Sequence, residues 1–147
     1  MNAAGRQEFK ATLHLEEHGH ITLEAGPRVP IAGGPPIDFG GTTIRWSPEH
    51  LVVGAAGLCF LSTLEWQAGG RGIELMDVRC TARGTIEMTS RGLAFNAIDL
   101  DLVATAAPGQ ANALRDAIAR AQARCLVSAS LTCPVRVRAE VTEGHVG

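Results

Sequence analysis

The residues best suited to chemistry in this chain are its four cysteines, Cys59, Cys80, Cys125 and Cys133. No pair of cysteines has the C-x-x-C spacing of a zinc site, and the histidines form no H-E-x-x-H pattern. The sequence therefore gives little support to a metal centre, and we expect no cofactor. The N-terminal residues lack the hydrophobic core of a secretory signal, which favours a cytoplasmic location and disfavours structural disulfides. The cysteines are therefore core thiols, metal ligands or reactive groups.

Two cysteines within reach of each other can carry out peroxide reduction. A thiolate cleaves the O–O bond and becomes a sulfenic acid, which then condenses with a second thiol. A free thiol has a pKa of about 8.5 and burial raises it, so a buried nucleophile requires a cationic partner. The alternative interpretation, that the cysteines are small core residues, stays open because free Cys is among the most buried residue types. For Cys80 and Cys133, at strand positions, the core interpretation is favoured.

Cys59 lies within the longest apolar stretch, which predicts a central helix from Ser47 to Gly70. The stretch opens with Ser-Pro-Glu, which suit the N-cap, the first helical position and the positive end of the helix dipole. From Leu51 to Leu61 no side chain is charged or strongly polar. A helix that is apolar on all sides is typically buried, and this run is too short to cross a bilayer.

The remaining segments predict strands and one further helix. We expect a hairpin over 9–25 and a bulge at residues 76–77. Residues 26–43 are expected to form a loop that is functional or covers a site, with room for a short strand over 29–31. Helical periodicity over Gln110 to Arg124 places Cys125 at the inward edge of the last turn. Alternating patterns predict a three-stranded meander and a final strand, over Ile73 to Ala82, Thr85 to Thr89, Leu93 to Val103 and Pro134 to Val141, with turns at Arg83-Gly84 and Arg91-Gly92. This order predicts one α+β domain over residues 1–147 with an antiparallel sheet.

Three segments together resemble the OsmC/Ohr family of osmotically inducible and organic hydroperoxide resistance proteins. They are Ser47 to Leu51, Ala55 to Phe60 and Cys125 to Ser128, and their order and spacing match the family pattern. The resemblance implies an intertwined homodimer in which antiparallel sheets wrap around two long helices, each chain being a single OsmC-like domain. It also implies that Cys59 attacks an organic hydroperoxide, that Cys125 resolves the product as a disulfide, and that a lipoyl-type dithiol regenerates the thiols.

The family pattern includes an arginine that this chain lacks at the matching places. The first hairpin turn is Glu-Glu-His-Gly, and the matching loop position is Asp38. Arg28 and Arg45 are the available substitutes, and Arg45 is closer to Glu49, which would anchor it. Since Glu49 lies roughly 15 Å from Cys59 along one helix, either a long arginine spans part of the gap or Glu49 acts from the partner subunit. The expected catalytic residues are Cys59, Cys125, Glu49 and Arg45.

The site, if formed, is expected to have an apolar lining that favours alkyl or lipid hydroperoxides. The residues that would supply this lining are Phe39, Trp46, Leu58 and Phe60, although the aromatic ones suit core packing equally well.

The sequence therefore favours a cysteine-based organic hydroperoxide reductase. The alternative is a non-catalytic OsmC-like protein that binds a small apolar ligand at the dimer interface. Acyl chemistry by Cys59 with His50 is disfavoured because roughly 13.5 Å of helix separates them. A net charge of −2 without a basic cluster gives nucleic acid and membrane surfaces no electrostatic support as partners.

Overall fold

The computed structural model describes residues 5–145, which fall into two compact units, one up to Leu51 and one from Val52 onward. The first unit holds a sheet of three short strands in the order β1-β2-β3, and both pairings are antiparallel. The predicted hairpin is confirmed, and its turn is a short 3-10 helix. These elements are β1 (Thr12–Leu15), η1 (Glu17–Gly19), β2 (Ile21–Glu24) and β3 (Ile31–Gly33).

The Pro- and Gly-rich loop after β3 is tightly closed. It contains a second 3-10 helix, η2 (Ile37–Phe39), and the N–H of Gly41 donates to the Pro36 carbonyl at 3.0 Å. A Cβ atom at Gly41 would overlap the Pro35 carbonyl oxygen, so only glycine fits at this position. The chain then returns to the sheet, where the Trp46 N–H donates to the Ala32 carbonyl at 3.0 Å.

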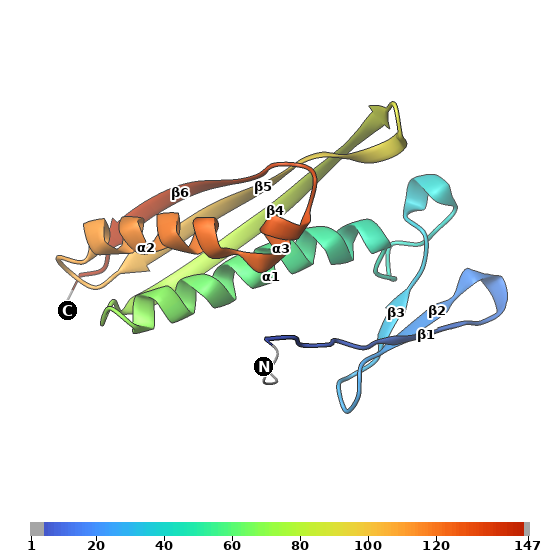
Figure 1. Ribbon diagram of the computed structural model, residues 1–147, viewed down its shortest axis with the longest axis horizontal. Helices are drawn as coiled ribbons and strands as arrows, with labels where there is room; N and C mark the ends of the chain where they lie inside the picture. The colour runs from blue at the N-terminus through green and yellow to red at the C-terminus, as the bar shows by residue number, and fades with distance from the viewer. Residues whose placement is uncertain (1–4, 146–147) are drawn as a thin grey trace. The chain divides into compact units, whose positions relative to one another are not determined.

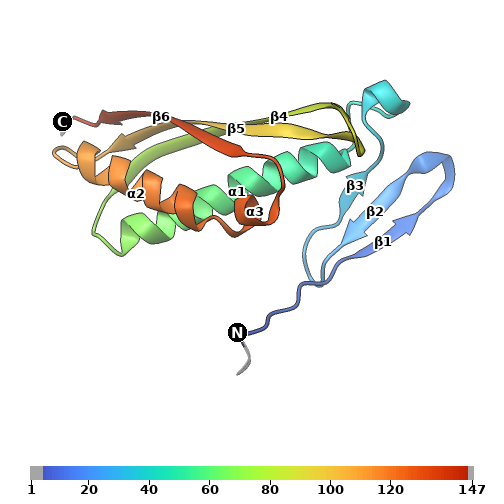
Figure 2. The same ribbon diagram turned by 45° about the horizontal axis from the view of Figure 1, so that its top comes forward.

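The second unit packs helices on one face of a three-stranded sheet (Figures 1 and 2). The sheet order is β4-β5-β6, with β4 and β5 antiparallel and β5 and β6 parallel. The prediction of an antiparallel sheet is thus wrong for the last strand, because helices cross the sheet face between β5 and β6 and return the chain in the same direction. The elements are α1 (Pro48–Gly69), β4 (Leu75–Thr89), β5 (Gly92–Ala106), α2 (Ala111–Arg124), α3 (Leu126–Ser130) and β6 (Val135–Glu143).

The turn predicted at Arg83-Gly84 is wrong, since β4 runs straight through it. Gly84 pairs with Ile98 in the ladder, and a Cβ atom on it would lie 2.6 Å from both a ring carbon of Phe95 and a methyl of Val53. Glycine is therefore needed here because the side chains of Phe95 and Val53 approach the backbone closely, which is a common reason for a glycine inside a strand. The predicted bulge is confirmed as a register shift between Leu75 and Asp77.

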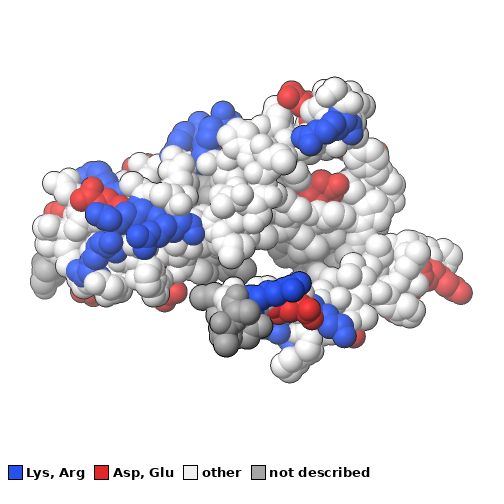
Figure 3. Space-filling model, viewed as in Figure 1, with Lys and Arg blue, Asp and Glu red and all other residues white. Residues whose placement is uncertain are grey.

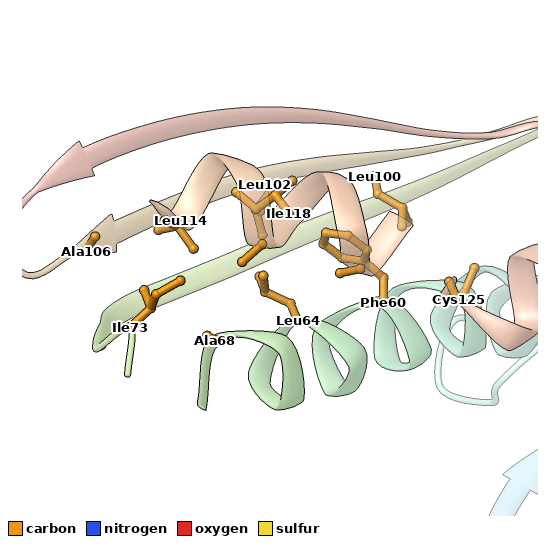
Figure 4. Packing of buried hydrophobic residues seen from close by; sticks show 14 of the residues in the cluster. Phe60, Leu64, Ala68, Ile73, Leu100, Leu102, Ala106, Leu114, Ile118 and Cys125 are labelled. Carbon is orange, nitrogen blue, oxygen red and sulfur yellow. The ribbon is translucent and has the colours of Figure 1, made fainter. Parts of the chain in front are cut away.

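The core lies between the sheet, α1 and α2 (Figure 4). Phe60 and Leu64 point from α1 towards Leu114 and Ile118 of α2, and these four side chains are at most 6% exposed. Helix α1 is not buried on all sides as predicted, since the described chain covers one of its faces and leaves Leu58 exposed on another. Its 22 residues and composition would also suit a membrane span, a property that core helices of globular proteins share.

The opposite face of the sheet carries a row of ion pairs. Asp99 of β5 pairs with Arg136 at 2.7 Å, and Asp101 pairs with Arg138 at 3.1 Å and with Arg83. The hydrogen bond from Arg136 and the nearby positive charges hold the pKa of Asp99 below its usual value. Acidic residues on the central strand are thus matched by basic residues on both neighbours.

Candidate functional site

The two cysteines predicted to react lie on different elements and are brought together by the fold. Cys59 is half-buried in the middle of α1. Cys125 is 3% exposed and lies between the end of α2 and the start of α3, beside α1 (Figure 4). Both are free thiols, and hydrogen bonding by the Cys125 side chain is one cause that lowers the pKa of Cys59. The structure therefore places a second thiol within reach of the first.

The pKa of the Cys59 thiol is lowered, and among residues 5–145 no charged side chain is a cause of this shift. Burial alone raises this pKa, but hydrogen bonds from the Val127 N–H, the Cys125 side chain, the Leu126 N–H and the Thr63 side chain together outweigh burial. Donors that favour the charged form are one of the three causes that shift a pKa. The sequence predicted a positive side chain as the cause, whereas backbone amides and uncharged neighbouring side chains lower this pKa in the described chain.

The two amides are free to act because they begin α3. The first N–H groups of a helix have no acceptor within the helix, and the N-cap, Cys125, makes no side-chain capping bond. The backbone at Cys125 is extended, with φ −69° and ψ 112°, and this break turns the chain out of α2 so that the next two residues face Cys59. Periodicity did not predict α3 because the helix is five residues long. The only signal was the resemblance of Cys125 to Ser128 to the family segment.

Helix α3 itself carries no charged side chain. The helix has the sequence LVSAS, whereas the preceding α2 carries Arg115, Arg120 and Arg124. In Figure 3 the largest group of Lys and Arg side chains lies over α2, and smaller groups lie elsewhere on the same face. Leu126 is 70% exposed, so an apolar side chain borders the thiols. An exposed apolar side chain at this place suits contact with the alkyl group of a substrate.

The predicted residues Glu49 and Arg45 belong to the first unit, so their part in the thiol site stays a prediction. Arg45 lines a hollow of about 420 Å³ together with Asp38 and His50. The Oε2 atom of Glu49 is buried and finds no hydrogen-bond partner in residues 5–145. Ser47 is the predicted helix cap, since its Oγ accepts from the His50 N–H at 3.2 Å.

The four residues predicted to line an apolar pocket lie in different environments. Phe60 is 1% exposed and belongs to the core, so it lines no open surface of this chain. Phe39, Trp46 and Leu58 are each more than half exposed. Their role in a pocket is untested, and each is available for contact with a ligand or a second chain.

The remaining cysteines belong to the packed interior of the second unit. Cys80 and Cys133 pack against the hydrophobic core, and burial raises the pKa of Cys80. Across residues 5–145, no group of three His, Cys, Asp or Glu side chains is placed to hold a metal ion.

Comparison with known proteins identifies related folds. The family model described as OsmC-like protein matches residues 40–140. An OsmC-like protein of unknown function from Vibrio cholerae is 14% identical with a TM-score of 0.83, over 92% of this chain and 100% of that one. No curated protein matches the sequence significantly.

Two similar structures carry functional names. An organic hydroperoxide resistance protein OsmC from Legionella pneumophila is 23% identical with a TM-score of 0.70, covering 92% of this chain and 97% of that one. The organic hydroperoxide resistance protein OhrB of Bacillus subtilis is 22% identical with a TM-score of 0.63, covering 92% and 98%. At such identities the likeness establishes the fold.

Proposed function

Because the chain belongs to the OsmC-like protein family, we propose that it is a thiol peroxidase that reduces organic hydroperoxides. The observation that carries the proposal is the lowered pKa of Cys59, to which the Cys125 side chain and the backbone N–H groups of Val127 and Leu126 contribute by hydrogen bonding. This arrangement offers a stabilised thiolate and a second thiol in reach, which are the two requirements of the reaction. The names of the Legionella and Bacillus neighbours support the choice of substrate class.

In the first step the Cys59 thiolate attacks the distal oxygen of the hydroperoxide ROOH. The S–O bond forms as the O–O bond breaks, and the leaving alkoxide takes up a proton to become the alcohol ROH. Cys59 is oxidised to a sulfenic acid, and the peroxide is reduced by two electrons. The N–H groups of Leu126 and Val127 hold the sulfur in position before the attack.

In the second step the Cys125 sulfur attacks the Cys59 sulfenic acid. A disulfide forms and one water leaves, carrying the hydroxyl of the sulfenic acid and the proton of the Cys125 thiol. Cys125 is shielded from solvent, so external peroxide meets the half-buried Cys59 first. An external dithiol, which we propose is of the lipoyl type, then reduces the disulfide by exchange and returns both thiols.

The proposal includes a homodimer in the cytoplasm. Helix α1 carries no charged or strongly polar side chain from Leu51 to Leu61, yet Leu58 and Trp66 remain 69% exposed in the single chain. A second copy that covered them would remove apolar surface from water and account for a helix with no polar face. A reducing compartment would keep the four free cysteines reduced between turnovers.

A second candidate function is binding of a small apolar ligand without catalysis. This candidate is favoured by the missing arginine, because Asp38 occupies the loop position where the family pattern has one. The neighbouring Phe39 is 58% exposed and offers an apolar contact. In this case the thiols would be inert towards peroxide, and an apolar ligand would bind to the reduced and the Cys59→Ser protein alike.

The two candidates are separated by mixing reduced protein with cumene hydroperoxide and counting free thiols after denaturation. We expect the loss of two thiols and a disulfide that peptide mapping assigns to Cys59 and Cys125. Cys125→Ser should stop at a Cys59 sulfenic acid that dimedone traps. Cys80→Ser is the matched control, since it removes a thiol away from the site and should still lose two. Thiol loss no greater than in Cys59→Ser would refute the peroxidase.

A further inference from the structure

A hydroxyl group lies one helical turn beyond Cys59, on the same face of α1. Thr63 follows Cys59 by four positions, a spacing that stacks side chains about 5–6 Å apart between their Cβ atoms. Its Oγ1 donates to the Cys59 carbonyl at 2.8 Å, which holds the side chain in one rotamer. The residue is half-buried, so protein rather than bulk water surrounds much of the hydroxyl.

We propose that Thr63 is a positioning residue whose hydroxyl switches from the Cys59 carbonyl to the Cys59 sulfur when the thiolate forms. This inference rests on the proposed function, because it names the residue that readies the same thiol for attack. It differs from the roles of Cys59 and Cys125 in that Thr63 exchanges no bond with the substrate.

The switch follows from the number of hydrogens available. A threonine hydroxyl has one hydrogen and can donate it to one acceptor at a time. A neutral thiol is a weak acceptor, so the carbonyl holds the hydrogen in the reduced, protonated state. An anionic sulfur is a stronger acceptor, and rotation of the hydroxyl about its C–O bond redirects the hydrogen towards it. The Thr63 side chain accordingly acts with the Leu126 and Val127 amides to lower the pKa of Cys59.

The same helix offers a matched comparison at the preceding residue. Ser62 also donates to the carbonyl four residues back, that of Leu58, at 2.8 Å. Ser62 is exposed and does not act on the Cys59 thiol. A change at Ser62 therefore removes the same kind of hydrogen bond to the helix backbone without touching the sulfur.

The test is the pH dependence of Cys59 alkylation by iodoacetamide, in a background where Cys80 and Cys133 are serine and Cys125 is followed separately by mass spectrometry. Thr63→Val keeps the shape and removes the hydroxyl, and Thr63→Ala removes it with the best helix former. Both variants should move the midpoint of the profile to higher pH, because the lost hydrogen bond is to a charged group. Alkylation at pH 6 should slow by about threefold, because the smaller thiolate fraction is only partly offset by the greater nucleophilicity of a more basic thiolate. Thr63→Ser should retain the wild-type profile, as should Ser62→Ala.

Unchanged profiles in both Thr63→Val and Thr63→Ala would overturn the inference, and so would a shift in Thr63→Val alone, which would mark a packing effect. Circular dichroism checks that each variant is folded. Alkylation does not involve peroxide, so the result stands apart from the proposed function. If cumene hydroperoxide leaves the wild-type thiols intact while the Thr63 variants shift, the peroxidase is refuted and the role of Thr63 remains.

Discussion

Replacing Leu126 by proline should remove one N–H donor from Cys59 while leaving the fold intact. Leu126 is the first residue of α3, the position where proline is best tolerated because its N–H has no helical acceptor. The residue before a proline must be extended, and Cys125 already is, with ψ at 112°. The same change at Val127 would place a helical residue before the proline and is unsuitable for that reason.

The size of the effect follows from the hydrogen bond that is lost. Hydrogen bonds to charged groups contribute about 1.5–3 kcal/mol, and the lower end applies here because Cys59 is half-buried and water can replace the donor. A loss of about 1.4 kcal/mol reduces the thiolate fraction about tenfold at a pH below the pKa. The remaining thiolate is more basic and about threefold more nucleophilic, for a Brønsted coefficient of about 0.45.

These two effects predict a crossing of the pH profiles. At low pH the Leu126→Pro variant should react with iodoacetamide about threefold more slowly than wild type, since the thiolate loss outweighs the gain in nucleophilicity. Above both pKa values the thiolate is complete in both proteins, and the variant should react about threefold faster. The assay is stopped alkylation across pH with mass spectrometry of the Cys59 peptide.

Leu126→Ala is the control, because it removes the exposed side chain and keeps the N–H. It should follow the wild-type profile at every pH. An equal slowing of Leu126→Pro at all pH values, or an identical shift in Leu126→Ala, would refute the assignment of the backbone amide as the source of the low pKa.

Three further predictions concern the fold around the site. Phe60→Ala should destabilise the protein by about 3–5 kcal/mol in urea unfolding, because the side chain is 1% exposed in the core, and a loss below about 1 kcal/mol would contradict its burial. Gly84→Ala should cost about 1–3 kcal/mol through overlap with Phe95, and a smaller residue at 95 should recover part of the loss in thermal melts. Arg136 lowers the pKa of Asp99 in the folded protein below 3.8, the ordinary pKa of this side chain in an unfolded chain. The ionised carboxylate therefore stabilises the fold at pH values above 3.8, and this stabilisation is lost as the pH falls through the lower pKa of the folded state. Asp99→Asn should therefore flatten the acid limb of stability against pH, and an unchanged slope would count against the ion pair.

The elements that carry the thiols could be predicted from local sequence. The Ser-Pro-Glu start fixes where α1 begins, since the cap and the first helical turn are satisfied by adjacent residues. The helical period of Leu114, Ile118 and Ala121 likewise places Cys125 at the inner edge of α2, and it is 3% exposed. Both inferences depend on interactions within a few residues, which a sequence shows directly.

Other features could not be predicted because they depend on contacts between distant segments. Gly84 resembles a turn glycine in sequence, and only the approach of Phe95 and Val53 shows that it is a strand glycine. The parallel pairing of β6 with β5 depends on the path of the helices between them. The burial of one side of α1 depends on which of its apolar faces meets the sheet, a choice that a helix without a polar face does not specify.

The sequence alone determined the family pattern, the two cysteines and the helices that hold them, since these are properties of local periodicity and spacing. It also showed that a nucleophilic Cys59 requires positive potential, but it suggested an arginine as the source. Only the tertiary structure identified the amides of Leu126 and Val127. The reason is physical: a backbone N–H is present at every residue except proline, and where it points is decided by how α3 packs against α1.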